Sequence, residues 1–159
     1  MFKLIGAAAV ILSSGLIGIR KYNEFYERKH TLQSIRDGAQ KIKNNLSCMC
    51  MPLYECFLSG GEFFEKAALC IKSGELPSEA VRNTALVTQC LKKGDKDIIL
   101  RFADGLCAYD CNGQIANIEL LLREIDGSIE DASGELKTKG TLFVKGSILA
   151  AAAVVLILI

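Results

Sequence analysis

The stretch that decides the fold is IANIELLLREIDGSIEDASGEL, residues 115–136, in which apolar residues recur at alternating steps of three and four. Residues 32–49, LQSIRDGAQKIKNNLSCM, show the same spacing. Such spacing is typical of a coiled-coil seam, a narrow apolar stripe that packs against the stripe of another helix. No proline interrupts either stretch, so the sequence predicts two long helices that pair antiparallel as a stalk. The predicted seam residues are Leu32, Ile35, Ile42 and Leu46 in the first stretch, and Ile115, Ile118, Leu122, Ile125 and Ile129 in the second.

Both ends of the chain are apolar. Residues 4–19 carry no charge and residues 140–159 carry only Lys145, whereas all 18 acidic and 17 of the 19 basic residues lie between Arg20 and Lys139. A helix needs about 17–25 residues to cross the hydrocarbon of a bilayer. We therefore expect transmembrane helices at residues 1–20 and 140–159, joined to a helical bundle at residues 21–139.

Charge and cysteine content predict which side of the membrane holds the bundle. Seven Lys or Arg residues lie between positions 20 and 43, and Lys3 alone precedes the first apolar stretch. The positive-inside rule then places the middle segment in the cytoplasm, with Arg20 and Lys21 as the topology determinants. Seven cysteines, an odd number, fit a reducing compartment better than an oxidising one.

Small residues recur along the first apolar stretch, at Gly6, Ser14 and Gly18. Small residues on one side of a membrane helix let a neighbouring helix approach closely. We expect these three to be packing positions in the transmembrane region. The sequence leaves open whether their partner belongs to the same chain or to a second protein, whether the stalk pairs within one chain, and whether the protein forms homo-oligomers.

Shorter helices are expected between the two seams. Turn residues bound them at 52–59, 62–73, from Pro77 to Gly94, and at 96–107 with Asp95 as the N-cap. No segment alternates with period two long enough to indicate a strand. The expected fold class is all-α: a cytoplasmic antiparallel helical bundle whose first and last helices continue into two transmembrane helices.

Catalytic and metal-binding motifs are weak in this sequence. The string nearest to a phosphate-binding loop, residues 140–147 (GTLFVKGS), lacks the GK[ST] ending. His30 is the single histidine, which excludes a zincin site, and although Cys107 and Cys111 could share a helix face, no cysteine pair has CxxC spacing. A net charge of +1 gives no bulk attraction to nucleic acid. We expect no enzymatic activity, no cofactor, no metal and no nucleic-acid partner.

Several motifs in order resemble one known family. They are FKLIGAAAVILSSGLIG at residues 2–18, the E-x-x-x-R-K-x-x-L run of Glu24–Leu32, Met51-Pro-Leu-Tyr-Glu55, D-I-I-L-x-F-x-x-G-L at Asp97–Leu106 with Asp110 and Gln114 behind it, and Lys139-Gly-Thr-Leu142. Together they are similar to the stage III sporulation protein AB family over essentially the whole chain. The chain departs from the family pattern in its cysteine content and at Asn44–Met51, which puts in question any partner contact made there.

The resemblance implies a non-enzymatic membrane protein of endospore formers, located in the outer forespore membrane of the mother cell with its central domain in the cytoplasm. It implies a platform, similar to that of type II secretion systems, in a secretion-like channel complex between mother cell and forespore. Its partners would be a cytoplasmic ATPase, other membrane proteins of the complex and the lipid bilayer. The alternative from the residues alone is a secreted or anchored thiol- or metal-binding helical protein with a cleaved N-terminal leader.

Overall fold

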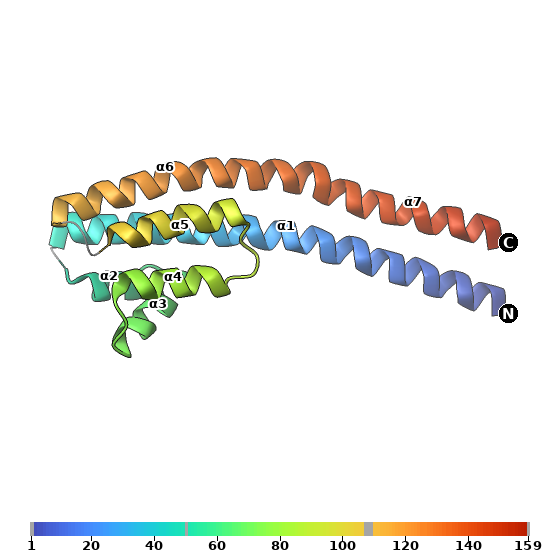
Figure 1. Cartoon of the computed structure of the whole chain (residues 1–159). Coiled ribbons are helices and arrows are strands. Elements are labelled where there is room, and N and C mark those ends of the chain that lie inside the picture. The colour runs from blue at the N-terminus through green and yellow to red at the C-terminus, as the bar shows by residue number, and fades with distance from the viewer. Residues whose placement is uncertain (1, 50, 107–109, 159) are drawn as a thin grey trace. The chain divides into compact units, whose positions relative to one another are not determined.

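The structure is a computed structural model that describes residues 2–49, 51–106 and 110–158; the side chains of residues 2–12, 14, 49, 151 and 155–158 also lie outside the description. Every regular element in the described ranges is a helix (Figure 1). The expected all-α bundle is thus confirmed. The chain divides into two compact units, which we call the bundle unit (residues 30–130) and the terminal unit (residues 1–29 and 131–159).

Two long helical segments run through these units. Helix α1 extends over Phe2–Met49, and it ends just before Pro52, whose ring disfavours helical backbone in the residue that precedes it. The second long segment begins with α6, Cys111–Glu135, and ends with α7, Thr141–Leu158. Both long segments had been expected from the proline-free seams.

A π-helical turn, η1 at Leu136–Gly140, joins α6 to α7, where the sequence predicts plain α-helix. Thr138 Oγ1 donates to Gly134 O at 2.7 Å and Thr141 Oγ1 donates to Lys137 O at 2.6 Å, so both hydroxyls compete with backbone donors around this turn. Gly140, the last residue of the turn, is buried, and a Cβ there would lie 3.1 Å from Tyr22 Cδ2. The turn therefore brings a glycine to the point where α1 comes close.

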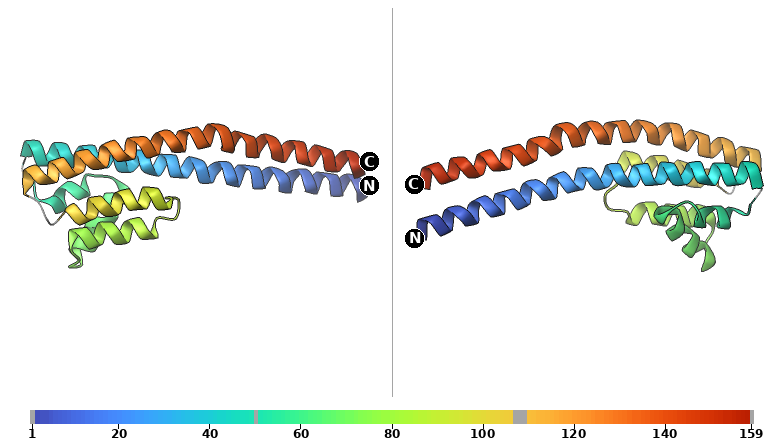
Figure 2. Two further views of the ribbon diagram at one scale, coloured as in Figure 1. Left: turned by 45° about the horizontal axis from the view of Figure 1, so that its top comes forward. Right: turned by 180° about the vertical axis from the view of Figure 1, so that it is seen from behind.

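Four shorter helices complete the bundle unit: α2 at Leu53–Leu58, α3 at Glu62–Lys72, α4 at Pro77–Val87 and α5 at Lys93–Gly105. Gly74 terminates α3 as expected: Glu75 N donates to Cys70 O and Gly74 N donates to Ile71 O in a Schellman motif that follows Lys72. In Figures 1 and 2, α1, α5 and α6 run alongside one another, and α2, α3 and α4 lie on the side of α5 away from α6.

Two expected helix boundaries are wrong. Helix α4 ends at Val87, not at Gly94, because Thr88 is extended and Leu91 is buried in the connection that follows. Asp95 is not the N-cap of α5 but its third residue, and its Oδ2 accepts a hydrogen bond from Lys92 N at 3.0 Å. Helix propensity at residues 88–92 is overridden by the tertiary packing of Leu91.

Phenylalanine rings form the core where the short helices meet. The Phe57 and Phe64 ring centroids are 5.3 Å apart, Phe63 meets Phe64 edge-on at 5.2 Å, and Phe102 meets Phe64 edge-on at 6.5 Å. These separations lie in the favourable range for aromatic pairs. The cluster ties α2, α3 and α5 together and fixes the α2–α3 turn against α1.

In the terminal unit, the first part of α1 lies beside α7 (Figures 1 and 2). A Cβ on Gly18 would meet Ser147 Oγ at 2.4 Å, so this small residue faces α7 of the same chain. Arg28 Nη1 pairs with Glu135 Oε2 at 2.8 Å, and the Phe25 ring stacks on Phe143. Across the described residues, none of the helices combines the length and apolarity required to traverse a bilayer.

Candidate interaction groove

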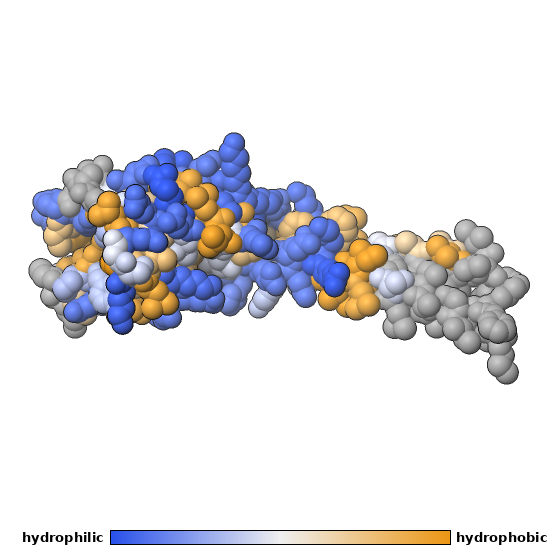
Figure 3. Space-filling view, turned by 60° about the horizontal axis from the view of Figure 1, so that its bottom comes forward, coloured by the Kyte–Doolittle hydropathy of each residue, from blue (hydrophilic) through white to orange (hydrophobic). Residues whose placement is uncertain are grey.

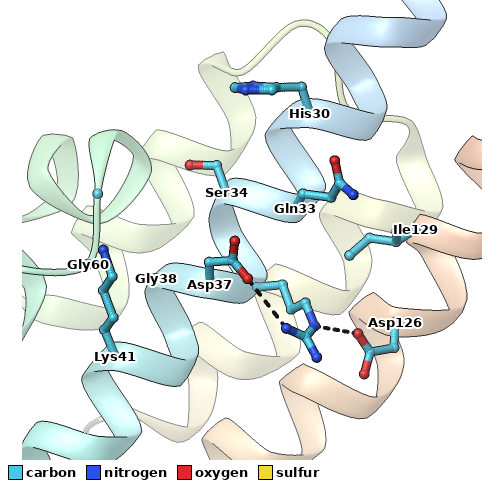
Figure 4. Close-up of a pocket in the computed structure, with 11 residues that line it drawn as sticks. His30, Gln33, Ser34, Asp37, Gly38, Lys41, Gly60, Asp126 and Ile129 are labelled. Atoms are coloured by element: carbon cyan, nitrogen blue, oxygen red, sulfur yellow. Dashed lines mark hydrogen bonds and ion pairs between the residues drawn. The ribbon is translucent and has the colours of Figure 1, made fainter.

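An open groove follows one face of α1 in the bundle unit (Figure 4). Its volume is about 610 Å³. The α2–α3 turn borders it on one side and α6 on the other. The lining residues are His30, Gln33, Ser34, Arg36, Asp37, Gly38, Lys41, Gly60, Gly61, Asp126 and Ile129.

Along one side of the groove, the backbone of the α2–α3 turn lies directly against α1. A Cβ on Gly38 would lie 1.9 Å from Gly60 O and 2.9 Å from Phe64 Cδ2, so only glycine allows the turn to approach α1 this closely. Gly61 has a φ of +84°, a conformation that favours glycine. Since neither Gly60 nor Gly61 carries a side chain, this border of the groove is low and leaves the face of α1 open.

An ion-pair cluster borders the opposite side. Arg36 Nε bonds Asp126 Oδ1 at 2.7 Å, and Arg36 Nη1 bonds Asp37 Oδ1 at 3.3 Å. Both carboxylates raise the pKa of Arg36, mainly through the hydrogen bond to Asp126. The guanidinium is therefore held by two acids, one from its own helix and one from α6, as the dashed lines in Figure 4 show.

The remaining polar residues on the face of α1 point toward solvent. Gln33, Asp37 and Lys41 are exposed, and Ser34 is half-buried. Arg36 engages both acids of the groove, and no ion pair to Lys41 is found among the described residues. The groove can thus offer an ammonium, an amide and a hydroxyl to a bound segment of another molecule.

In the described part of the chain, no group of three or more His, Cys, Asp or Glu side chains is arranged to hold a metal ion. The described free thiols are Cys48 and Cys111, which are exposed, Cys70 and Cys90, which are half-buried, and Cys56, which is buried. Cys107, the other half of the expected Cys107–Cys111 pair, lies outside the described residues. Burial raises the pKa of the Cys56 thiol, with the Glu55 carboxylate as a smaller cause.

The residues predicted for the stalk lie along the pairing of α1 with α6. Leu32, Ile35, Ile42, Leu46, Ile118 and Ile125 are buried, whereas Ile115, Leu122 and Ile129 are half-buried. Leu121, which the seam did not include, is buried instead of its neighbour Leu122. Arg20 and Lys21 are exposed and Gly18 packs on α7, whereas the burial of Gly6 and Ser14 lies outside the description.

Sequence reasoning missed the ion pairs that flank the stalk. Arg36 pairs with Asp126, and Lys43 Nζ pairs with Glu119 Oε1 at 3.2 Å. Each of these four residues directly follows a predicted seam residue. Arg36 and Lys43 are seven positions apart on α1, and Glu119 and Asp126 are seven positions apart on α6. Charges at positions flanking a seam select the register of paired helices. Aligning the two seams antiparallel would have revealed both pairs.

Fold and site together define an all-helical protein in which a polar groove follows one face of α1 in the bundle unit. The family model of stage III sporulation protein AB (spore_III_AB) matches residues 3–159. The chain therefore belongs to the stage III sporulation protein AB family, as its motifs indicated. A comparison with curated proteins and one with solved structures gave no match.

Proposed function

We propose that this sporulation protein is a non-enzymatic membrane platform that docks a cytoplasmic ATPase in the groove over α1. The observation that carries the proposal is the family match over residues 3–159, which fixes a role in stage III of sporulation. The groove supplies the surface on which such a role could act. The platform would belong to a secretion-like channel complex between mother cell and forespore, in the outer forespore membrane.

Membrane attachment is proposed for the terminal unit. Residues 4–19 and 146–159 of the sequence contain no charged side chain. Figure 3 shows hydrophobic residues gathered on the described surface of this unit, and its exposed large apolar side chains include Leu16, Ile17, Leu142 and Leu149. Water exposure of so many apolar groups is unfavourable, which supports their contact with lipid. Arg20 and Lys21 would then mark the cytoplasmic side, with the bundle unit in the cytoplasm.

The groove supports docking because its shape is already fixed. Two carboxylates hold Arg36, and the backbone contact between Gly38 and Gly60 fixes the turn beside it. Preorganised surfaces lose little conformational entropy when a partner binds. Lys41 provides the cation for an acidic residue of the ATPase, and Gln33 and Ser34 provide hydrogen bonds.

Capture of the ATPase of the same complex by the detergent-solubilised full chain tests the proposal. Lys41→Glu reverses a charge in the groove, and Lys72→Glu reverses an exposed lysine on α3 outside it as the matched control. We expect K41E to capture at least tenfold less ATPase and K72E to capture as much as the wild type. Ser34→Trp, which fills the groove without changing charge, should weaken capture in the same way.

Two results would contradict the proposal. Undiminished capture by both K41E and S34W, with native far-UV circular dichroism, would show that the ATPase binds elsewhere. Normal sporulation of a strain that lacks the protein would remove the platform role itself.

A further inference from the structure

The connection from α4 to α5 carries an exposed apolar pair. Leu86 and Val87, the last two residues of α4, are 53% and 73% exposed. Leu91 of the same connection is buried, so the segment is packed onto the bundle. Two adjacent apolar side chains exposed at the end of a packed helix can bury apolar area against a partner surface.

Three lysines follow this pair closely in the sequence. Lys92, Lys93 and Lys96 lie within five positions, and Lys92 and Lys93 are exposed. Lys96 Nζ donates to the backbone oxygen Leu86 O at 2.8 Å, which holds its ammonium at the last turn of α4. Of the two acids in this segment, Asp95 is buried and accepts the Lys92 N–H, which leaves Asp97 as the exposed one. We call Leu86, Val87, Lys92, Lys93 and Lys96 the α4–α5 surface.

The α4–α5 surface lies at one defined end of the bundle unit. Cys90 Sγ lies 3.3 Å from Thr31 Oγ1, so the connection contacts α1 next to His30, where the chain enters this unit. Helix α5 is antiparallel to α6, since Asn117 Nδ2 donates to Phe102 O and Gln114 Nε2 donates to Leu106 O, further along α5. The start of α5 therefore lies toward Glu130, where the chain leaves the unit.

We propose that the α4–α5 surface rests on an anionic lipid bilayer and steadies the bundle against the membrane. The inference rests on the membrane attachment proposed above, because both chain segments that would lead to the bilayer leave the bundle at this end. Lysines close to a membrane surface are attracted by anionic head groups. Exposed leucine and valine beside them can enter the interface, while the lysine stems lie along it with their ammonium groups in water.

A single tryptophan can report this contact, since the chain contains none. Val87→Trp places it on the α4–α5 surface, and Leu76→Trp places it at the opposite end of the same helix, where Leu76 is 59% exposed. The full chain is reconstituted into vesicles of phosphatidylcholine brominated high on its acyl chains, with or without phosphatidylglycerol. Flotation of the vesicles measures membrane attachment in the same samples.

We expect the fluorescence of V87W to be quenched at least twofold more in vesicles with phosphatidylglycerol than without, and that of L76W to be unaffected. Lys92→Glu with Lys93→Glu in the V87W background should abolish the difference. Chain that floats with the vesicles while V87W and L76W quench alike would overturn the inference and leave membrane attachment standing. If the V87W fluorescence changes only after the ATPase is added, the α4–α5 surface binds a protein, and the lipid inference is overturned. Failure to float would contradict the membrane attachment itself.

Discussion

Two glycines of the paired helices should respond in opposite directions to the same substitution. Replacing an exposed helical glycine with alanine stabilises a protein by about 1 kcal/mol, because alanine has less conformational freedom to lose. Gly127 on α6 is such a site, since a Cβ there has no neighbour within 4 Å. At Gly38 the new Cβ would lie 1.9 Å from Gly60 O, and the obstructing atom belongs to the backbone.

Gly38→Ala must therefore move the α2–α3 turn by more than 1 Å and disturb Phe64, whose Cδ2 would lie 2.9 Å from the added carbon. Overpacking of this kind costs about 3 kcal/mol at the upper end of its usual range. After the gain of about 1 kcal/mol in helix propensity, we expect a net loss of about 2 kcal/mol. For a chain of this length that lowers Tm by about 4–8 °C, whereas Gly127→Ala should raise Tm by about 2–4 °C.

Thermal unfolding of the two variants in the same detergent, followed by far-UV circular dichroism, measures both shifts. The opposite sign is the informative result, because any general effect of alanine on the helices is common to the two variants. A rise in Tm for Gly38→Ala equal to that for Gly127→Ala would refute the close contact between α1 and the α2–α3 turn, and with it the low border of the groove.

Further predictions concern the ion pairs and the buried thiol. Arg28→Ala should destabilise the protein by about 2 kcal/mol in denaturant unfolding, since the lost hydrogen bond is charged on both sides and Arg28 and Glu135 are only 8% and 19% exposed. Glu135 keeps its ion pair with the exposed Lys139 at 2.9 Å, which limits the loss. Arg36→Ala should leave unfolding nearly unchanged, because that pair is about half-exposed to solvent; an equally large loss there would make the groove arginine a structural residue. Cys56 should be alkylated more slowly than Cys48 and Cys111 when the modified peptides are quantified by mass spectrometry. Because burial raises its folded pKa, its rate should still be rising above pH 9.0, and a plateau below that pH would count against the burial.

The pairing of the two long helices was predictable because it depends on the periodicity of apolar residues in the sequence. Alternating steps of three and four on two proline-free stretches are enough to indicate paired long helices, and the two prolines mark where shorter helices begin. Helix ends were less predictable. Val87 ends α4 although residues 88–93 contain no glycine or proline, and only the burial of Leu91 in three dimensions explains why the chain leaves the helix there.

The groove could not be predicted from spacing alone. Glycine is a poor helix former, so the sequence alone gives no reason for Gly38 in a long helix. The reason is the close approach of Gly60, which only the three-dimensional structure shows. Arg36 and Asp126 are ninety positions apart and look like ordinary surface charges until the two seams are placed in register. Spacing on each helix predicts that a core exists, but which surface residues meet depends on the register between helices.

The ion pairs of Arg36 with Asp37 and Asp126 bear on the docking that we propose for the groove. An ion pair with both partners about half-exposed contributes little to stability, so its main physical effect is to restrict one long side chain to a single position. A free arginine would lose considerable rotamer freedom on contact with a partner. Here Asp37 and Asp126 have already removed that freedom, and the glycine contact has done the same for the opposite border. A partner that enters the groove therefore has to order mainly Lys41 and Gln33, which is why a charge reversal at Lys41 should weaken capture while the fold stays intact.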